Sequence, residues 1–306
     1  HPERLTKPLI RIKDKKKDLH PSINFLNIHE YFREASWDEA LNFASEGFKK
    51  LIYNKENNKS NLAGFGSAKC SNEEAYLFQK LIRTGFETNN VDHCTRLCHA
   101  SSVAALLETI GSGAVTAPFY EVQHSEVIIV IGANPTENHP VAATFFKNAA
   151  KRGAKLIVMD PRGHSLKKHA THMLQFKPGS DVALLNSIMN VIIEENLFNE
   201  EYIKKQTSGF DDLKKHLKNY PPEIMEEHTG INAELIKEVA RLYAKTEKGI
   251  IFWGMGISQH VHGTDNSRCL ISLALMTGNV GKRGTGLHPL RGQNNVQGAA
   301  DMGCQP

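Results

Sequence analysis

The sequence has few cysteines, little net charge and no long apolar run. Five cysteines in 306 residues are too few and too unevenly spaced for a disulfide framework, so we expect a reducing compartment, the cytoplasm. The formal net charge is only +4, and the densest basic run, residues 13–17, contains Asp14, which argues against a nucleic-acid partner. The longest apolar run, Val127–Ala133, is far shorter than the roughly 20 residues of a transmembrane helix, which excludes a membrane span.

The chain also lacks any sign of a natural start. It opens at His1, without an initiator Met, a basic n-region or an apolar h-region, so this end carries no signal peptide. We therefore expect a piece cut from a longer protein. The length is enough for one large or two ordinary domains, and the apolar fraction of 40% is that of a globular protein with a buried core.

Helix and strand signals alternate along the chain. The S-x-x-E spacing at Ser36–Glu39, and again at Ser71–Glu74, is that of a capping box and predicts helices that run to Ile52 and to about Gly85. A short strand is expected between them, at Asn61–Phe65. Further along, the predicted strands are residues 126–132, 155–159, 172–176 and 249–253, and the predicted helices are residues 101–110, 140–152, 181–195 and an amphipathic series that continues to 246.

This order predicts an α/β fold with a doubly wound, mostly parallel, Rossmann-like sheet. We place this dinucleotide-binding domain at residues 94–293. Residues 1–93 are expected to form part of a second, flanking α/β lobe, and residues 294–306 to return into that lobe. In a doubly wound sheet, ligands bind beyond the carboxyl ends of the strands, so the loops at those ends are candidates for a site.

The loop Gly132–His139 follows the first buried strand but lacks the G-x-G-x-x-G turn, which makes a plain NAD site a poor fit. Its Asn134, Glu137 and Asn138 can still contact a nucleotide through their side chains and the following helix N-terminus. Ordinary turn chemistry explains these residues equally well.

Other loops carry polar or small residues at matching places. Asp160 closes the second strand where nucleotide-binding sheets place an acid on ribose hydroxyls, and Arg162 beside it can pair with a phosphate. The loop Lys177–Asp181 leads into a helix that Ser180 or the next residue would cap. The loop Gly254–Gln259 has small residues where a backbone must approach something flat or bulky. Together these loops predict a ligand that contains a nucleotide.

One short stretch brings two cysteines and two histidines together: His93, Cys94, Cys98 and His99. They could form a tetrahedral zinc set, although structural zinc sites usually draw their ligands as two pairs from separated segments. A catalytic cysteine would need a base elsewhere, and no local signature supports one. A thiolate just before a helix that begins near residue 101 would have its pKa lowered by the helix dipole, which suits a soft metal or a redox centre.

The segment His288–Gly303 is nearly free of apolar residues and contains one strong cation and several amides. Its Arg291 could orient a small carboxylate through two hydrogen bonds. The alternative is a polar connecting loop.

These segments together resemble the catalytic, or alpha, subunit of formate dehydrogenase, within the molybdopterin oxidoreductases. The motifs come in the family's order, and the resemblance covers essentially the whole chain: Cys94-Thr-Arg-Leu-Cys98-His99, Gly132-Ala-Asn-Pro, Asp160-Pro-Arg162, Trp253-Gly-Met-Gly-Ile-Ser-Gln259, Leu275-Met-Thr-Gly-Asn-Val-Gly281 and Arg291-Gly-Gln-Asn-Asn-Val-Gln-Gly298. The resemblance implies molybdenum or tungsten on two molybdopterin guanine dinucleotides (bis-MGD), and a chain that is the central fragment of such a subunit.

The resemblance also implies roles for single residues. Cys98 takes the position of the metal ligand, His99 that of the neighbouring proton acceptor and Arg291 that of the residue that holds the carboxylate of formate. The positions that line a guanine dinucleotide are Leu97, Asn134, Glu137, Asn138, Asp160, Arg162, Gly179, Asp181, Met255, Gly256, Gln259 and Gln293. Removal of two electrons from formate then gives carbon dioxide, with the cofactor supplying the chemistry.

Members of the family carry an Fe–S segment before this region and further domains after it. A 4Fe-4S cluster is therefore expected only outside this chain, and an electron-transfer subunit or domain is an expected partner. Two alternatives stay open. One is a sibling such as an assimilatory nitrate reductase, which usually places Met after the cysteine, and the other is a non-catalytic metal-binding module that uses His93, Cys94, Cys98 and His99.

Overall fold

The computed structural model describes residues 4–12, 23–24, 26–53 and 62–306. His1, the basic run 13–17 and the first residue of the strand predicted at 61–65 lie outside the described residues. The chain divides into two compact units. The small unit is drawn from residues 1–66, 73–92 and 302–306, and the large unit from residues 67–72 and 93–301.

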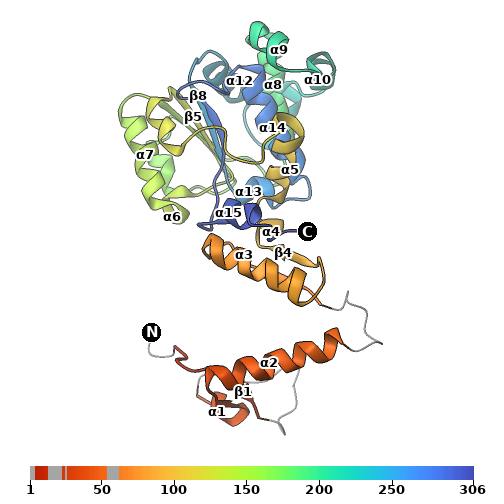
Figure 1. Cartoon of the computed structure of the whole chain (residues 1–306). Helices are drawn as coiled ribbons and strands as arrows, with labels where there is room; N and C mark the ends of the chain where they lie inside the picture. The colour runs from red at the N-terminus through yellow and green to blue at the C-terminus, as the bar shows by residue number, and fades with distance from the viewer. Residues whose placement is uncertain (1–3, 13–22, 25, 54–61) are drawn as a thin grey trace. The chain divides into compact units, whose positions relative to one another are not determined.

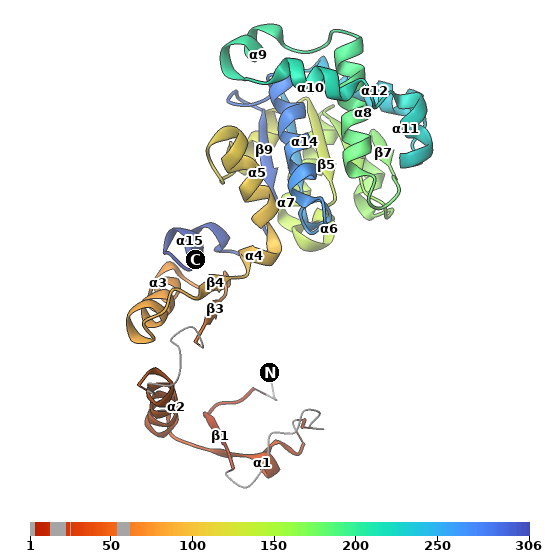
Figure 2. The same ribbon diagram turned by 90° about the vertical axis from the view of Figure 1, so that its right-hand side faces the viewer.

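The large unit is built around a sheet of five strands, each parallel to its neighbours (Figure 1) (Figure 2). The strands are β5 (Val127–Ile131), β6 (Lys155–Met159), β7 (His172–Leu174), β8 (Gly249–Trp253) and β9 (Gly286–Pro289), and their order across the sheet is β7-β6-β5-β8-β9. The chain starts at the central strand β5, moves outward through β6 and β7, and then crosses back to β8. This is the doubly wound order that the sequence predicts.

The central strand forms where the sequence is apolar and β-branched on both faces. All five residues of β5 are buried, and the strand pairs along its whole length with β6 on one side and β8 on the other. Alternate residues point to opposite faces, so that Ile129 belongs to one hydrophobic core and Ile128 and Val130 to another. A strand covered on both faces needs no polar side, which explains the continuous apolar run.

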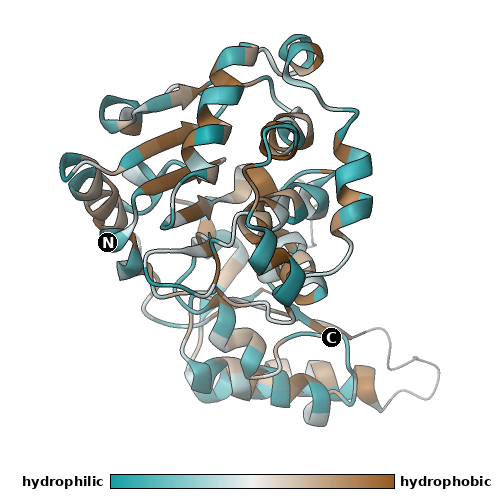
Figure 3. Cartoon of the chain, turned by 90° about the horizontal axis from the view of Figure 1, so that it is seen from above, coloured by the Kyte–Doolittle hydropathy of each residue, from teal (hydrophilic) through white to brown (hydrophobic). Residues whose placement is uncertain are grey.

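Helices cover both faces of this sheet. On one face, the core includes residues from α5 (Ala100–Ile110), α8 (Asp181–Glu194), α12 (Ala233–Ala244) and α14 (Gly263–Met276); on the other, it includes residues from α7 (Pro140–Lys151) and the 3₁₀ helices η3 (Phe119–His124) and η4 (Ser165–His169). Figure 3 shows largely apolar strands enclosed by helices with polar segments. The other helices of the unit are α4 (Thr95–Cys98), α6 (Pro135–Asn138), α9 (Glu200–Gln206), α10 (Phe210–Leu217), α11 (Pro222–Thr229), α13 (Met255–Ser258) and α15 (Val296–Asp301).

The ends of the predicted helices have identifiable local causes. Helix α5 stops at Gly111, which adopts the left-handed conformation with a φ of 75°. At the start of α8, however, the Ser180 side chain does not cap the helix, whereas the Asp181 carboxylate accepts from its own backbone N–H. The Ser180 hydroxyl instead donates to the Lys177 carbonyl oxygen at 2.6 Å, because a serine side chain can bond its own turn in place of the helix.

Two predicted details at the β8 side of the sheet are wrong. Gly249–Trp253 is not the last strand, because β9 follows it at the edge of the sheet. The sequence Gly-Leu-His-Pro has no β-branched residue and ends in a proline, which sheets accept at edges, so its pattern did not predict a strand. The predicted loop Gly254–Gln259 contains the one-turn helix α13.

The small unit holds the described part of a second α/β lobe. Its strands are β1 (Leu9–Arg11), β2 (Phe32–Glu34), β3 (Gly64–Gly66) and β4 (Val91–His93), and its helices are α1 (Ile28–Tyr31), α2 (Trp37–Ile52), α3 (Asn72–Lys80) and the π-helical turn η2 (Leu81–Gly85). Strand β1 pairs antiparallel with β2, and β3 with β4 forms a second two-stranded sheet. As predicted, the Ser36 side chain caps α2 by accepting from the Glu39 N–H at 3.1 Å. None of the described helices in either unit has the length and apolar composition needed to cross a bilayer.

Candidate active site

The carboxyl ends of all five strands of the large unit meet at one cavity of about 680 Å³. Gly132 follows β5, Asp160 follows β6, Phe176 follows β7, Gly254 follows β8 and Leu290 follows β9. This is the edge at which doubly wound sheets bind ligands, beside the point between β5 and β8 where the strand order reverses.

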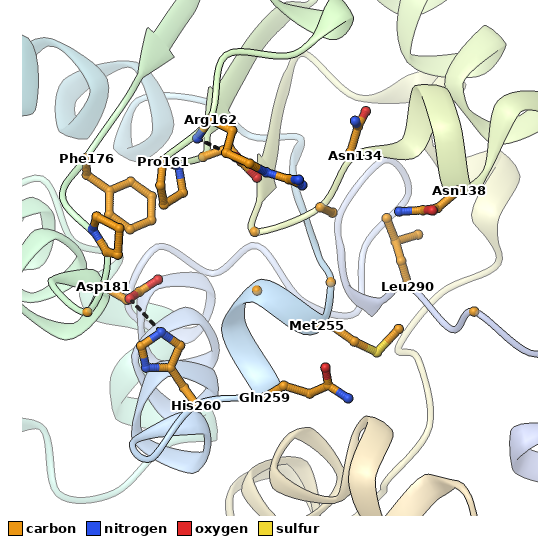
Figure 4. Close-up of a pocket in the computed structure, with 18 of the residues that line it drawn as sticks. Asn134, Asn138, Pro161, Arg162, Phe176, Asp181, Met255, Gln259, His260 and Leu290 are labelled. Atoms are coloured by element: carbon orange, nitrogen blue, oxygen red, sulfur yellow. Dashed lines mark hydrogen bonds and ion pairs between the residues drawn. The ribbon is translucent and has the colours of Figure 1, made fainter. Parts of the chain in front are cut away.

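Most of the residues predicted to bind a cofactor line this cavity. They are Asn134, Asn138, Asp160, Arg162, Gly179, Asp181, Met255, Gly256 and Gln259. Figure 4 shows Asn134 and Asp181 on opposite sides of the cavity. Leu97 lines a neighbouring hollow that Gln259 shares, and Glu137 lines another that Arg162 shares. Gln293 takes a different place, because its side-chain oxygen accepts from the backbone N–H of Ala68 at 3.2 Å.

Two glycine-bearing loops touch each other directly at the cavity wall. Gly132 has a φ of 56°, and a Cβ built on it would lie 2.9 Å from the backbone nitrogen of Ile257. A Cβ on Gly256 would lie 2.8 Å from the Cα of Gly132, and the Gly256 N–H donates to the Gly132 carbonyl at 3.0 Å. Only glycine permits this approach, which leaves bare backbone next to the cavity for a flat ring or a phosphate.

Two buried carboxylates also line the cavity. Asp160 accepts a hydrogen bond from the backbone N–H of Arg162 at 2.8 Å, while the Arg162 side chain is 79% exposed. Asp181 is 3% exposed, and burial raises its pKa, whereas His260, with Nε2 3.9 Å from Oδ2, lowers it (Figure 4). A ligand that donates hydrogen bonds to these carboxylates would offset the free energy lost when they leave water.

Cys98 lies at the end of α4, beside the cavity. Its Sγ is 3.3 Å from Sδ of Met255, and the backbone N–H of Gly292 donates to it. Burial raises the pKa of the Cys98 thiol, and the nearby Arg291 opposes this only in part. The predicted lowering by a helix dipole is therefore wrong. Cys98 is the last residue of α4, where the dipole disfavours an anion, and α5 begins two residues later with His99 as its N-cap.

His99 is fully buried and both of its ring nitrogens have partners. Nε2 donates to the Leu290 carbonyl oxygen at 2.9 Å, so the neutral ring carries its hydrogen on Nε2, and Nδ1 lies 3.1 Å from the Ser102 hydroxyl. Burial, with a smaller contribution from the charge of Arg291, lowers the pKa of His99 to about 4. The ring is therefore uncharged at pH 7.

Arg291 is a partly buried cation next to the Cys98 thiol. Its Nη2 donates to the Gly113 carbonyl oxygen at 3.2 Å. Its Nη1 is buried and has no hydrogen-bond partner among the residues that the structure describes. Burial lowers the pKa of Arg291 and Cys98 raises it, but a guanidinium stays charged in proteins. A buried donor without an acceptor is costly, so this nitrogen is available for an anionic ligand.

Residues 4–305 match the family model of the molybdopterin oxidoreductases. The chain belongs to this family. A molybdopterin oxidoreductase must accommodate a large pterin-type cofactor, and the cavity is suited to one. Its volume is in the range of cofactor sites, it presents bare glycine backbone, and its buried carboxylates can accept hydrogen bonds.

The relatives of this molybdopterin oxidoreductase include formate dehydrogenases. It is 42% identical over 304 residues to the F420-dependent formate dehydrogenase subunit alpha of Methanocaldococcus jannaschii, and the matched region covers 99% of this chain and 42% of that protein. It is 41% identical over 272 residues to formate dehydrogenase H of Escherichia coli, which covers 89% of this chain and 38% of that protein. The chain thus spans about two fifths of the length of the curated relatives it matches.

A solved structure has the same architecture. Acetylene hydratase from Pelobacter acetylenicus superposes with a TM-score of 0.79, at 24% sequence identity, over 94% of this chain and 37% of that chain. This similarity confirms the α/β fold.

The described side chains do not assemble the four-ligand metal site considered from sequence. In the part of the chain that the structure describes, no three His, Cys, Asp or Glu side chains come together in a way that could hold a metal ion. The side chains have separate partners: Nδ1 of His93 lies 3.1 Å from the Thr95 hydroxyl, and the Cys94 thiol donates to the side-chain oxygen of Gln293 at 2.9 Å.

Sequence reasoning assigned no role to several residues that line the cavity, among them His139, Phe176, His260 and Leu290. Phe176 ends a predicted strand, and His260 directly follows a predicted site residue. Both could have been found from the sequence, because each lies at the end of a segment that already pointed to the site. His139 and Leu290 lie within the loop 132–139 and the segment 288–303 that the sequence singled out, but nothing in either stretch marked these two residues. Their positions depend on contacts with distant segments, such as the hydrogen bond from Nε2 of His139 to the Arg291 carbonyl oxygen at 2.7 Å.

Proposed function

We propose that this chain is part of a formate dehydrogenase catalytic subunit, which oxidises formate to carbon dioxide and passes two electrons to a bis-MGD cofactor that carries molybdenum or tungsten. Membership of the molybdopterin oxidoreductases supports the cofactor class. The names of the relatives from Methanocaldococcus jannaschii and Escherichia coli support formate as the substrate.

The observation that carries the proposal is the unpartnered Nη1 of Arg291 beside Cys98. A small monoanion next to the thiol would accept a hydrogen bond from this nitrogen and neutralise a partly desolvated charge. Formate is the smallest carboxylate, and a guanidinium donates to carboxylates in a fixed, planar geometry. Arg291 therefore orients the substrate in this proposal.

The residues present fit the cofactor as well. The Cys98 sulfur is a soft ligand suited to molybdenum or tungsten, and Leu97, Glu137, Gln293 and the predicted residues of the cavity would contact a guanine dinucleotide. When bound, the cofactor supplies the site that takes two electrons from the substrate.

The reaction HCOO⁻ → CO₂ + H⁺ + 2e⁻ also releases a proton, and we assign its acceptance to His99. The ring is uncharged because burial lowers its pKa, so it is in the state that can accept. Nδ1 is the atom that would take the proton, since Nε2–H is engaged by Leu290. The Ser102 hydroxyl at Nδ1 can rotate to accept a hydrogen bond from the protonated ring.

The electrons leave through an electron-transfer subunit or domain in this proposal. A 4Fe-4S cluster would lie in the protein outside these residues, and the reaction would take place in the cytoplasm. The cluster and the electron-transfer partner follow from the family resemblance, and the cytoplasm follows from the small number of cysteines.

The direct test is to purify the protein with its cofactor and assay formate oxidation with an artificial electron acceptor, and nitrate reduction with a reduced dye. We expect formate oxidation alone, with molybdenum or tungsten present in stoichiometric amounts. Nitrate reduction without formate oxidation would show instead a sibling nitrate reductase.

A matched pair of cysteine variants tests the site within the same protein. Cys98→Ser should abolish formate oxidation and lower the content of bound metal, because serine is a poor soft-metal ligand. Cys94→Ser should be mild, because the hydroxyl can still donate to the side-chain oxygen of Gln293. Equal losses in both variants would contradict a single-cysteine site.

A further inference from the structure

Two imidazoles hold two consecutive peptide carbonyls beside the cavity. Nε2 of His99 donates to the carbonyl oxygen of Leu290 at 2.9 Å, and Nε2 of His139 donates to the carbonyl oxygen of Arg291 at 2.7 Å. The histidines come from different segments, one between α4 and α5 and the other between α6 and α7. The segment that carries the predicted substrate-binding arginine is thus held from two sides.

Two described hydrogen bonds hold the peptide between Arg291 and Gly292: its carbonyl accepts from His139, and its N–H donates to the Cys98 sulfur. Arg291 lies just beyond the end of β9, where the sheet pairing stops, and the last backbone hydrogen bond before it runs from the Leu290 N–H to the Trp253 carbonyl at 2.7 Å. The side chain has one hydrogen bond, from Nη2 to Gly113. The hydrogen bond from His139 holds the carbonyl side of this peptide, while Cys98 holds its N–H side, and together they set the direction in which the arginine side chain leaves the backbone.

The tautomer of His139 follows from its acceptor. A carbonyl oxygen accepts only, so Nε2 carries the hydrogen and Nδ1 is left with a lone pair. Nδ1 is buried and has no partner among the described residues, and the ring lines the cavity. The unsatisfied ring nitrogen costs free energy, which offsets part of what the hydrogen bond to the Arg291 carbonyl contributes to stability. The net contribution of the imidazole to the stability of the fold is therefore small, and its main effect is on the position of the Arg291 peptide.

We propose that His139 is a positioning residue, which orients Arg291 through its main-chain carbonyl and thereby sets the affinity for the substrate carboxylate. The inference rests on the proposed formate-oxidising function and deepens it. His139 need not touch the substrate. Its effect passes through one hydrogen bond to the residue that binds the anion.

The test compares His139→Leu with His139→Gln in the protein purified with its cofactor. Leucine removes the donor, and glutamine keeps an N–H that can reach the same carbonyl. We expect His139→Leu to raise the KM for formate about five- to tenfold, the size of one lost hydrogen bond, with kcat changed less than twofold. His139→Gln should stay within about twofold of the wild type.

A second measurement does not depend on turnover. Azide is a small monoanion that presents terminal nitrogen acceptors, and its dissociation constant can be measured by isothermal titration. His139→Leu should weaken azide binding by the same five- to tenfold factor, while metal content stays at the wild-type level and Tm falls by no more than the loss of one hydrogen bond accounts for. His262→Leu is the matched control, because His262 is exposed and its imidazole pairs with Asp265 away from Arg291.

The outcomes separate this inference from the proposed function. Wild-type protein that carries its cofactor but oxidises no formate contradicts the proposed function. Wild-type activity with unchanged KM and azide affinity in His139→Leu contradicts only the positioning role. A fall in kcat, metal content and Tm that glutamine does not rescue would show that His139 acts on the fold instead.

Discussion

The strands of the central sheet and the loops at their carboxyl ends lie in the same unit but bury different kinds of residue. Ile129 in β5 and Phe252 in β8 have no exposed surface and belong to hydrophobic cores. Beyond the strand ends, the loops bury Asp160 and Asp181, and Arg291 keeps a buried nitrogen without a described partner. The apolar residues of the strands are fully packed within the protein, whereas the loops at the strand ends bury polar groups that still lack hydrogen-bond partners.

The difference shows that stability and binding reside in separate residues. Burial of apolar strand residues contributes the favourable free energy of folding, roughly 25 cal/mol per Å² of apolar surface. Burial of charged groups at the edge costs free energy unless a ligand completes their hydrogen bonds. Mutations in the strands should therefore lower the free energy of unfolding, whereas mutations of polar residues in the loops should mainly weaken ligand binding.

The largest effect is expected in the middle of the sheet. Phe252 packs with ring centroids 4.8 Å from Phe146 and 4.7 Å from His288. Phe252→Ala removes these contacts and leaves a cavity, which should lower the free energy of unfolding by about 3–5 kcal/mol in chemical denaturation followed by circular dichroism. Phe65, which is 84% exposed, supplies the control, and Phe65→Ala should change the free energy of unfolding by less than about 0.5 kcal/mol. Equal losses would contradict the comparison.

The second prediction concerns pH and the buried His288 of β9. Burial lowers its pKa to about 4, while a histidine of the unfolded chain titrates near 6.5. As pH falls, the unfolded state takes up the proton first, so the contribution of His288 is present above about pH 6.5 and is lost toward pH 4, by up to about 3 kcal/mol.

His288→Phe should flatten this part of the pH dependence of the unfolding free energy. The phenyl ring can keep the stacking on Phe252 without a titrating group. Denaturation curves at several pH values between about 7 and 4.5 provide the measurement. His262→Phe, at an exposed position, should keep the wild-type slope, and an unchanged slope in His288→Phe would overturn the prediction.

A smaller effect is expected where the two glycine loops meet. A Cβ on Gly256 would lie 2.8 Å from both Cα and the carbonyl oxygen of Gly132. Gly256→Ala should force the loops apart and cost about 1–3 kcal/mol in the same denaturation assay. Gly47→Ala is its control, because nothing lies within 4 Å of a Cβ there and α2 should gain up to about 1 kcal/mol. A neutral Gly256→Ala would show that the loops can separate freely.

The smallest effect on stability is expected at the cavity carboxylate Asp181. Burial raises its pKa, so its contribution is present at low pH and is lost as pH rises through the folded-state pKa. Asp181→Asn should remove this pH dependence and change the unfolding free energy at pH 7 by less than about 1 kcal/mol.

Binding should respond much more strongly than stability to the same change. Asp181→Asn should weaken the binding of guanosine monophosphate about tenfold or more by isothermal titration, because a carboxylate accepts from two neighbouring N–H groups of a base and an amide opposes one of them. Asp212→Asn, at a side chain that is 87% exposed, should leave nucleotide binding unchanged. If Asp181→Asn binds the nucleotide as the wild type does, this carboxylate is not a base contact.

Much of the fold followed from patterns between residues close in the chain. The apolar, β-branched run of β5 predicted a buried strand, and Ser36 predicted the start of α2, because strand burial on two faces and helix capping leave local signatures. The candidate site followed in part for the same reason, since Asp160 and Asp181 come directly after or just before such elements. The assigned functions of these residues, and the domain bounds at 94 and 293, stay predictions.

The features that the sequence did not predict depend on burial and on pairing with distant segments, which cannot be read from residues close together in the chain. The pKa of Cys98 was expected to fall from its place near a helix start, but the folded chain takes the thiol out of water and raises it. The short edge strand β9 forms because β8 offers it a partner, and its own sequence has no strand pattern.

By itself, the sequence determined the parallel strands β5, β6 and β8, the helices between them, and the motifs that place the chain among the molybdopterin oxidoreductases, because each depends on residues within one short segment. Only the tertiary structure decided which polar groups meet at the edge of the sheet. His139 and Arg291 are 152 positions apart and share a hydrogen bond of 2.7 Å. Such a contact arises from the packing of whole segments, so neither neighbourhood in the sequence records it.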